Sequence, residues 1–262
     1  MRMTEVSFDE KLAQWQAWCQ APWGRLRFSV VRETLGRQTA ALGGGEGGLR
    51  ILDVGGGDGG DAVPLAEAGH DVTVLDPAPS WLAEARRRAE EAGVGDRVRT
   101  LEGTVDDLSA AGDGYDLVLC HCVLQYRPAD SGDVGRLAAA LRTGGRLSVM
   151  APNPAARVVM RLTREGPEAA LAELAANRLE AATFDTTVRK VTADEMEVLL
   201  AAEGLTPVGR YAARVANDYI ADDTLKDDPT YFAALERLEL ALCDQEPYVG
   251  LGGMWQVVAE RH

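Results

Sequence analysis

From residue 50 to residue 150 the sequence alternates short apolar segments with segments of helical periodicity, and this alternation limits the possible folds more than any other feature. Strands that are apolar along their whole length, with helices between them, are typical of a parallel sheet covered on both faces. The sequence therefore predicts an α/β fold whose ligand lies at the carboxyl ends of the strands. The expected strands are 50–54, 71–75, 97–101, 115–120 and 146–150, and the expected helices are 59–68, 79–92 and 133–141.

The segments on either side of this region depart from the alternation. Residues 1–41 predict two helices with a turn at 21–24, where Pro22 and Gly24 interrupt the apolar pattern. The glycine-rich residues 43–48 predict a flexible connector. We therefore expect N-terminal helices and a linker at 1–48, followed by one domain at 49–262.

Beyond residue 150 the pattern predicts a helix, a strand, a second helix and a final strand. Thr192 is a plausible cap for the first of these helices. Residues 155–181 are helix-prone and are followed by a less regular stretch to residue 190. Because the strand–helix alternation has broken off, we expect the segments 155–190 and 216–250 to form cap insertions over the substrate site. The four expected elements are 193–203, 207–215, 229–243 and 253–260.

The composition limits the kinds of molecule that this chain is expected to bind. The formal net charge is −14, and an acidic chain is poorly steered toward nucleic acid unless its basic residues cluster. The apolar runs are too short to span a bilayer, and residues 1–10 lack the apolar region of a signal peptide, so a cytoplasmic protein without membrane contact is expected. The four cysteines show no paired metal spacing, and we expect no metal site.

The stretch Ile51–Gly59, ILDVGGGDG, carries the first chemical signal. An apolar strand runs directly into glycines, which can take positive φ and allow a ligand to approach the backbone closely. Dinucleotide-binding proteins share such loops, so the glycines alone do not identify the ligand. Asp53 precedes the glycines, and a carboxylate there suits the ammonium of a methionine moiety better than a pyrophosphate. We expect Asp53 to bind that moiety, and we expect Gly55, Gly56 and Gly57 to belong to the same cofactor-binding loop.

Acidic residues also follow the next two strands. Asp76 ends the second strand about 20 positions after the glycines, where a carboxylate can accept hydrogen bonds from both ribose hydroxyls. The alternative is that Asp76 caps the helix after Pro77. Asp106 lies where an adenine edge is expected, with Thr104 and Val105 flanking the ring, although a helix cap would also explain Asp106.

This set of residues resembles the class I S-adenosylmethionine-dependent methyltransferases, and most of the chain is similar to the bacterial SmtA type. Characterised members of that type methylate the carboxyl group of 5-carboxymethoxyuridine in tRNA. The resemblance implies a Rossmann-like, mixed seven-stranded sheet with helices on both faces and a helical cap, and it implies S-adenosylmethionine as the cofactor. It rests on residues 24–27, 52–57, 116–124, 214–219 and, outside the cofactor-binding region, 238–248.

The resemblance also implies roles for individual residues. Arg27 should reach the cofactor carboxylate, Asp76 should hold the ribose, and Thr104 and Val105 should flank the adenine. His121 should lie beside the cofactor after the fourth strand, unless it is a satisfied buried imidazole. We expect substrate contacts from the following residues, although packing within the cap explains the tyrosines equally well: Tyr126, Arg214, Tyr219 and Tyr248.

The sequence does not identify the molecule that accepts the methyl group. A carboxylate acceptor is already ionised and needs no general base, whereas a hydroxyl or amine would make His121 a candidate base. Related tRNA-modifying members carry a lysine-rich run in the cap, where residues 177–184 here have hardly any basic charge. The acceptor is therefore either tRNA or a small metabolite. The same residues would also suit a non-catalytic module that keeps the cofactor as a structural ligand or, more remotely, an NAD-dependent oxidoreductase.

Overall fold

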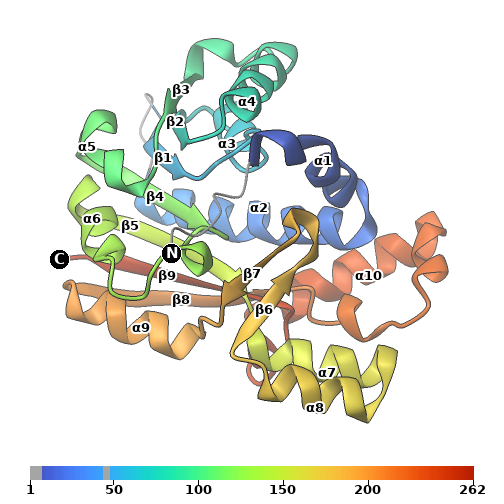
Figure 1. Ribbon diagram of the computed structural model, residues 1–262. Coiled ribbons are helices and arrows are strands. Elements are labelled where there is room, and N and C mark those ends of the chain that lie inside the picture. The colour runs from blue at the N-terminus through green and yellow to red at the C-terminus, as the bar shows by residue number, and fades with distance from the viewer. Residues whose placement is uncertain (1–7, 44–47) are drawn as a thin grey trace.

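In the computed structural model, which describes residues 8–43 and 48–262, a seven-stranded mixed sheet forms the centre of the fold (Figure 1). The first five strands are parallel, and β9 runs antiparallel between β5 and β8. This confirms the α/β fold predicted from the alternating elements and the mixed seven-stranded sheet implied by the resemblance. In order across the sheet, the strands are β3 (Val98–Glu102), β2 (Asp71–Asp76), β1 (Arg50–Val54), β4 (Tyr115–His121), β5 (Leu141–Pro152), β9 (Met254–Arg261) and β8 (Leu205–Ala213).

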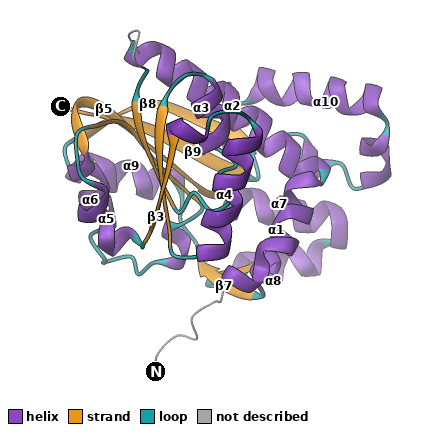
Figure 2. Cartoon of the chain, turned by 90° about the horizontal axis from the view of Figure 1, so that it is seen from above, coloured by secondary structure: helices purple, strands orange, loops and turns teal. Residues whose placement is uncertain are grey.

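Helices cover both faces of this sheet, as Figure 2 shows from above. On one face, α2 (Pro22–Leu42), α3 (Ala62–Glu67) and α4 (Pro79–Glu91) pack over a core that includes Val31, Leu35 and Ile51. On the other face, α5 (Leu108–Ala111), α6 (Asp133–Ala140) and α9 (Ala193–Ala202) pack over a second core. Both faces are thus buried, which is why the central strands are apolar along their whole length.

Three further groups of elements flank the sheet. On the amino-terminal side, α1 (Leu12–Gln20) precedes α2, and only Ala21 between them is not helical. The turn is therefore shorter than the expected 21–24, and Gly24 lies inside α2. After β5 come the hairpin of α7 (Pro154–Glu165) and α8 (Pro167–Ala175) and the two-stranded sheet of β6 (Arg178–Ala181) and β7 (Thr186–Arg189). After β8, the chain forms η6 (Asn217–Tyr219), η7 (Asp223–Asp227), α10 (Pro229–Leu242) and η8 (Tyr248–Gly250).

Local signals explain several of these boundaries. Thr192 caps α9 as expected: its hydroxyl accepts from the Glu195 N–H, and the Glu195 carboxylate accepts from the Thr192 N–H. The helix expected from residue 59 begins only at Ala62, because the glycine-rich turn extends that far. Strand β5 is longer than expected and begins at Leu141. Most of the expected connector, residues 44–47, lies outside the described residues.

A membrane span requires a long apolar helix, and a metal site requires a cluster of ligating side chains. Within the described parts of the chain, no helix combines the length and the apolar character needed to cross a bilayer. Across the same residues, no group of three His, Cys, Asp or Glu side chains is arranged to hold a metal ion.

Candidate cofactor and acceptor site

A cavity opens at the carboxyl ends of β1 to β4, at the edge of the sheet where the sequence predicts the ligand. The loops after these four strands form its floor, and α1, α2 and the β6–β7 hairpin complete its wall. Ten residues singled out in the sequence lie on its lining: Arg27, Asp53, Gly55, Gly56, Gly57, Asp76, Thr104, Val105, His121 and Tyr126.

The glycine loop forms a cradle that side chains would fill. Gly55 has φ 71° and Gly57 has φ 54°, a backbone conformation that other residues rarely adopt. A Cβ on Gly55 would lie 2.3 Å from Val123 Cγ2, and one on Gly57 would lie 2.7 Å from the Trp81 ring. The loop therefore requires glycine for its conformation and also because Val123 and Trp81 pack directly against it.

The carboxylates beneath this loop are buried and held close together. Burial raises the pKa of Asp53 well above its usual range, and the nearby charge of Asp61 adds to the rise. Among the described residues, no side chain forms an ion pair with Asp53. Burial also raises the pKa of Asp76 to about 6, although its carboxylate accepts hydrogen bonds from the Gly57 and Ala78 N–H groups at 3.0 and 2.9 Å. A cation placed here would relieve the repulsion among these acids.

His121 belongs to a buried hydrogen-bonded chain that crosses the sheet. Its Nδ1 lies 2.9 Å from the Asp61 carboxylate, and its Nε2 lies 2.8 Å from Ser148 Oγ. Gln256 donates to Ser148 Oγ in turn. Burial lowers the pKa of His121 in spite of Asp61, so the imidazole is neutral, with its Nδ1 proton on the side of the carboxylate. Both ring nitrogens are therefore engaged.

Arg27 reaches the same cavity from α2 and is held by Asp61. The guanidinium makes a two-pronged contact with the carboxylate, at 2.5 and 2.8 Å. Burial alone would raise the pKa of Asp61, but Arg27 and His121 hold it below its usual range. The structure thus places Arg27 at the cavity, as the sequence predicts, but with a carboxylate of the protein already bound to it.

Aromatic side chains close the cavity from above. The Trp15 ring stacks on Trp81 at 5.9 Å and on Phe184 at 6.2 Å, and Phe184 meets Tyr126 edge-on at 6.2 Å. Trp15 comes from α1 and Phe184 from the β6–β7 hairpin, two segments far apart in the sequence. The Trp15 indole also donates to Asp58 at 3.1 Å. The expected cap segment 155–190 thus supplies one aromatic residue to the cavity.

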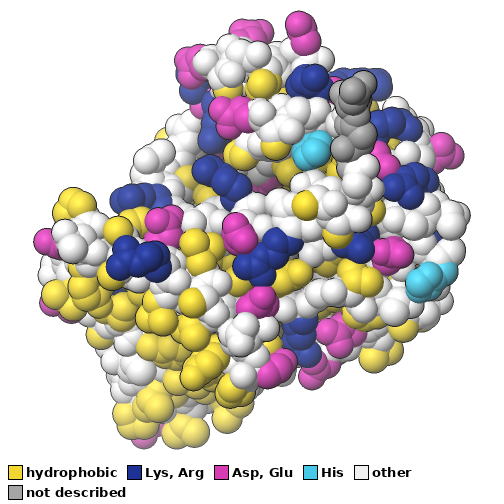
Figure 3. Space-filling view, turned by 180° about the vertical axis from the view of Figure 1, so that it is seen from behind, with side chains coloured by type: hydrophobic (Ala, Val, Ile, Leu, Met, Phe, Trp, Pro, Cys, Tyr) yellow, Lys and Arg dark blue, Asp and Glu magenta, His cyan; other side chains and the backbone are white. Residues whose placement is uncertain are grey.

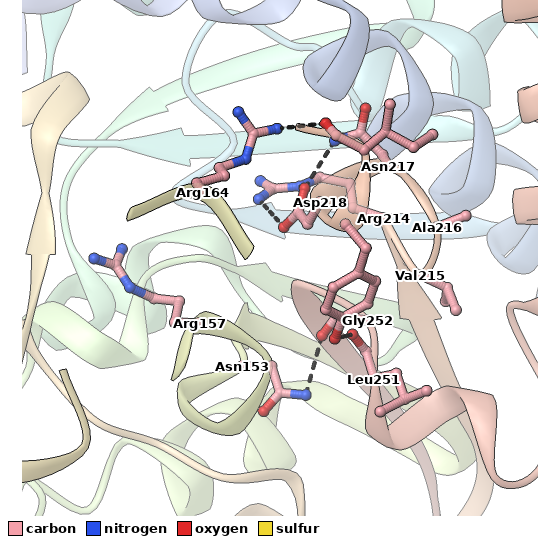
Figure 4. A network of polar contacts seen from close by, with 12 residues as sticks. Asn153, Arg157, Arg164, Arg214, Val215, Ala216, Asn217, Asp218, Leu251 and Gly252 are labelled. Atoms are coloured by element: carbon pink, nitrogen blue, oxygen red, sulfur yellow. Dashed lines mark hydrogen bonds and ion pairs between the residues drawn. The ribbon is translucent and has the colours of Figure 1, made fainter. Parts of the chain in front are cut away.

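The other sequence-predicted residues lie outside the lining. Asp106 is exposed and bound by both arms of Arg127, whose own side chain does line the cavity. Figure 4 shows Arg214 pointing to Asp218, which it binds at 2.9 Å, and the Tyr219 hydroxyl donates to the Leu251 carbonyl at 2.6 Å. Tyr248 is exposed on η8. Of the four expected substrate residues, only Tyr126 lies on the cavity wall.

Arg214 nevertheless lies near that wall. Burial raises the pKa of the Cys122 thiol to about 11, and the positive charges of Arg27 and Arg214 oppose this rise. Cys122 lines the cavity directly after β4. Arg214 itself adopts φ 63°, and its loop is held by Glu239, which accepts from the N–H groups of three consecutive residues, Val215 to Asn217, at 2.7 to 3.0 Å.

Several residues that line the cavity were not predicted from the sequence. Asp58 lies within the glycine stretch Ile51–Gly59 and Asp61 lies two residues after it, so their position alone could have marked them. The aromatic residues could not have been found, because nothing in the sequence relates α1 to the β6–β7 hairpin. The residues missed are Trp15, Phe28, Asp58, Asp61, Trp81, Cys122, Arg127 and Phe184.

Known proteins share both the domain and the fold. Residues 51–145 match the family described as "Methyltransferase domain". The tRNA 5-carboxymethoxyuridine methyltransferase of Escherichia coli K12 is 29% identical over 241 residues, which cover 91% of this chain and 89% of that protein. The ubiquinone biosynthesis O-methyltransferase of Azorhizobium caulinodans is 44% identical, but over only 30% of each chain.

Solved structures agree in fold. The magnesium protoporphyrin IX methyltransferase of Synechocystis, crystallised with bound S-adenosylhomocysteine, superposes with a TM-score of 0.65. The superposition covers 97% of this chain and 96% of that one, at 16% sequence identity. The same enzyme has also been crystallised with S-adenosylmethionine. With a methyltransferase domain from residue 51 to residue 145, a methyltransferase sheet and a glycine cradle above buried acids, the chain is a class I S-adenosylmethionine-dependent methyltransferase.

Proposed function

We propose that this enzyme methylates a carboxylate and so produces a methyl ester. The observation that carries the proposal is the engagement of both nitrogens of His121, to Asp61 and to Ser148. A hydroxyl or amine acceptor must lose a proton, and the one histidine on the cavity wall has no free nitrogen to receive it. A carboxylate acceptor is already ionised at neutral pH and needs no base.

The cofactor is assigned to the floor of the cavity. S-adenosylmethionine supplies an electrophilic methyl group on a positively charged sulfur. We assign its ammonium to Asp53, its ribose to Asp76 and its adenine to the wall at Thr104 and Val105. The cavity supports this assignment, because the backbone of Gly55 and Gly57 lines it without side chains of its own, and the buried Asp53 and Asp76 lie beside that backbone.

Arg27 is assigned to the carboxylate end of the cofactor. Its two terminal nitrogens bind Asp61, so the cofactor must share the guanidinium with Asp61 or displace it. The repulsion between Asp61 and a second carboxylate is offset only if the guanidinium lies between them. Arg27 therefore positions the donor and does not take part in proton transfer.

The acceptor is assigned to the side of the cavity at Cys122 and Tyr126. Arg214 lies near Cys122, and it would contact an anionic acceptor by sharing with it the guanidinium that Asp218 already binds. The remaining task of the protein is alignment of the acceptor oxygen with the methyl group and sulfur. The E. coli relative, which matches over nearly the whole chain, bears in its name a substrate with a carboxymethoxy group.

Alkaline lability of the product tests the proposal. The purified protein is incubated with methyl-labelled S-adenosylmethionine and an extract of metabolites and tRNA, and the products are then treated with mild alkali. Methyl esters release labelled methanol, whereas methyl ethers and methylamines keep the label. Asp53→Asn serves as the inactive control. Label that resists alkali in the wild-type reaction would exclude a carboxylate acceptor.

A small acidic molecule is the second candidate for the acceptor, and the charge of the chain favours it over tRNA. The net charge is −14, and in residues 177–184, at the cap, Arg178 is the single basic residue. Few cations are then available to bind phosphates. Separation of the extract into tRNA and small molecules before the assay decides between the two, because alkali-labile label will follow only one fraction.

A further inference from the structure

In the α7–α8 hairpin, a cluster of charged side chains lies on the inner side and several large apolar side chains face solvent. This is the reverse of the usual arrangement in a globular protein. Glu173 is buried at 8% exposure and binds Arg157 at 3.1 Å and Arg161 at 3.4 Å on the inner side of the hairpin. On the outer side, large apolar side chains face solvent. Their exposed fractions are 40% for Val159, 48% for Leu162, 58% for Leu171 and 64% for Leu174.

These four residues, with the exposed Ala155, Ala172 and Ala175 between them, define the hairpin surface. Figure 3 shows, from behind, a broad apolar area over the end of the molecule where α7 and α8 lie. Contiguous apolar patches of this kind mark interaction sites in soluble proteins.

The charges around the hairpin surface indicate the partner. The exposed residues of α7 and α8 include no lysine or arginine, and the partly exposed Arg157, Arg161 and Arg164 of α7 are each paired with a carboxylate. The surface is therefore poorly suited to the phosphates of nucleic acid or of anionic lipid, and the net charge of −14 would repel both. Glu168 lies in the first turn of α8, and Arg178 follows the end of that helix. Within the described residues neither side chain has an ion-pair partner, although Arg178 hydrogen-bonds to Thr187.

We propose that the hairpin surface binds a second copy of this chain in a two-fold symmetric dimer. Glu168, Leu171 and Leu174 follow one another along α8, and Arg178 lies beyond the carboxyl end of that helix, as the first residue of β6. When two such helices lie antiparallel, the leucines of one pack on the leucines of the other, and each Glu168 lies opposite Arg178 of the other copy. A two-fold contact requires this kind of self-complementary surface. The small alanines allow the helices to approach closely.

The size of the surface sets the expected strength. The 12 residues of α7 span about 18 Å at 1.5 Å per residue, and two helices side by side are about 20 Å wide. The surface is therefore roughly 360 Å² in projection, below the ~800 Å² per partner of a standard interface. We expect a reversible dimer that forms at micromolar concentration.

Sedimentation velocity over a range from about 1 to 200 μM tests the proposal. The wild-type protein should shift from monomer to dimer within this range. The double variant Leu171→Glu/Leu174→Glu should weaken dimerisation about 100-fold, since it places charges at the centre of the contact. Val198→Glu is the matched control, because Val198 is 70% exposed on α9, away from the hairpin, and this variant should dimerise like the wild type.

A charge exchange identifies the partner as a second copy. Glu168→Arg or Arg178→Glu alone should weaken the dimer about tenfold through repulsion, and the two together should restore it. Rescue by the double exchange is expected only if the two side chains meet across the contact. A protein that stays monomeric at every concentration, or a Leu171→Glu/Leu174→Glu variant that dimerises like the wild type, would overturn the proposal.

Discussion

Acidification should weaken the binding of S-adenosylhomocysteine through Asp76. Asp76 is 7% exposed, and burial raises the pKa of its carboxyl group to about 6 in the free protein. To accept hydrogen bonds from ribose hydroxyls as well as from Gly57 and Ala78, the group must be ionised. Binding therefore lowers its pKa and releases a proton wherever the free protein is protonated.

The magnitude follows from this pKa. At about pH 5, some nine in ten free molecules carry the proton, and its removal costs about 1.4 kcal/mol, or tenfold in affinity. Affinity should therefore rise about tenfold from pH 5 to pH 7 through Asp76, and above pH 7 this contribution should be constant. Asp53, whose pKa is also raised by burial, adds a dependence of the same sign.

Isothermal titration calorimetry at several pH values, in buffers of different ionisation enthalpy, measures both the affinity and the protons released. In Asp76→Asn, the rise in affinity should be about tenfold smaller than in the wild type. Asp96→Asn is the matched control, because Asp96 is exposed and lies outside the cavity lining, and it should keep the wild-type dependence. The reasoning is refuted if the wild-type affinity is the same at pH 5 and pH 7, or if Asp76→Asn keeps the full dependence.

Three further predictions concern the loop, the imidazole and the acceptor-side turn. Gly55→Ala should weaken S-adenosylhomocysteine binding at least about tenfold, because its Cβ would meet Val123 at 2.3 Å, whereas Gly112→Ala, at φ 84° with open space around it, should leave binding unchanged. His121→Ala should lower the free energy of unfolding, measured in denaturant, by about 3 kcal/mol. If His121 is not a base, the wild-type rate of methyl transfer to a carboxylate should also show no step from about pH 6 to pH 9. Glu239→Gln should lower the free energy of unfolding by about 2 kcal/mol, because three N–H groups lose part of their acceptor, and calorimetry should find the affinity for S-adenosylhomocysteine unchanged within about twofold.

Much of the cofactor region could be predicted because its signals are local. A strand that runs into glycines, such as Arg50–Val54, has few alternative conformations, and the next acid at a strand end is placed by the parallel sheet. The Thr192 cap also depends only on residues within one helical turn. Such features follow from the order of residues along the chain.

The acceptor side was less predictable because its contacts join distant segments. Asp106 pairs with Arg127 across 21 residues and so lies away from the cavity. Arg214 is paired with Asp218, and Tyr219 donates to a backbone carbonyl 32 residues away. Whether a polar side chain faces a ligand or another part of the protein depends on which of these partners comes closer in the folded chain.

By itself, the sequence determined the alternating elements, the glycine loop that needs positive φ, and the acids at 53 and 76, since hydrophobic periodicity and backbone sterics act over short distances. Only the tertiary structure decided that Asp61 would hold both Arg27 and His121, that Trp15 would meet Phe184 above the cavity, and that the leucines of α8 would face solvent. Each of these outcomes depends on packing between segments that lie far apart in the chain, and local preferences do not encode that packing.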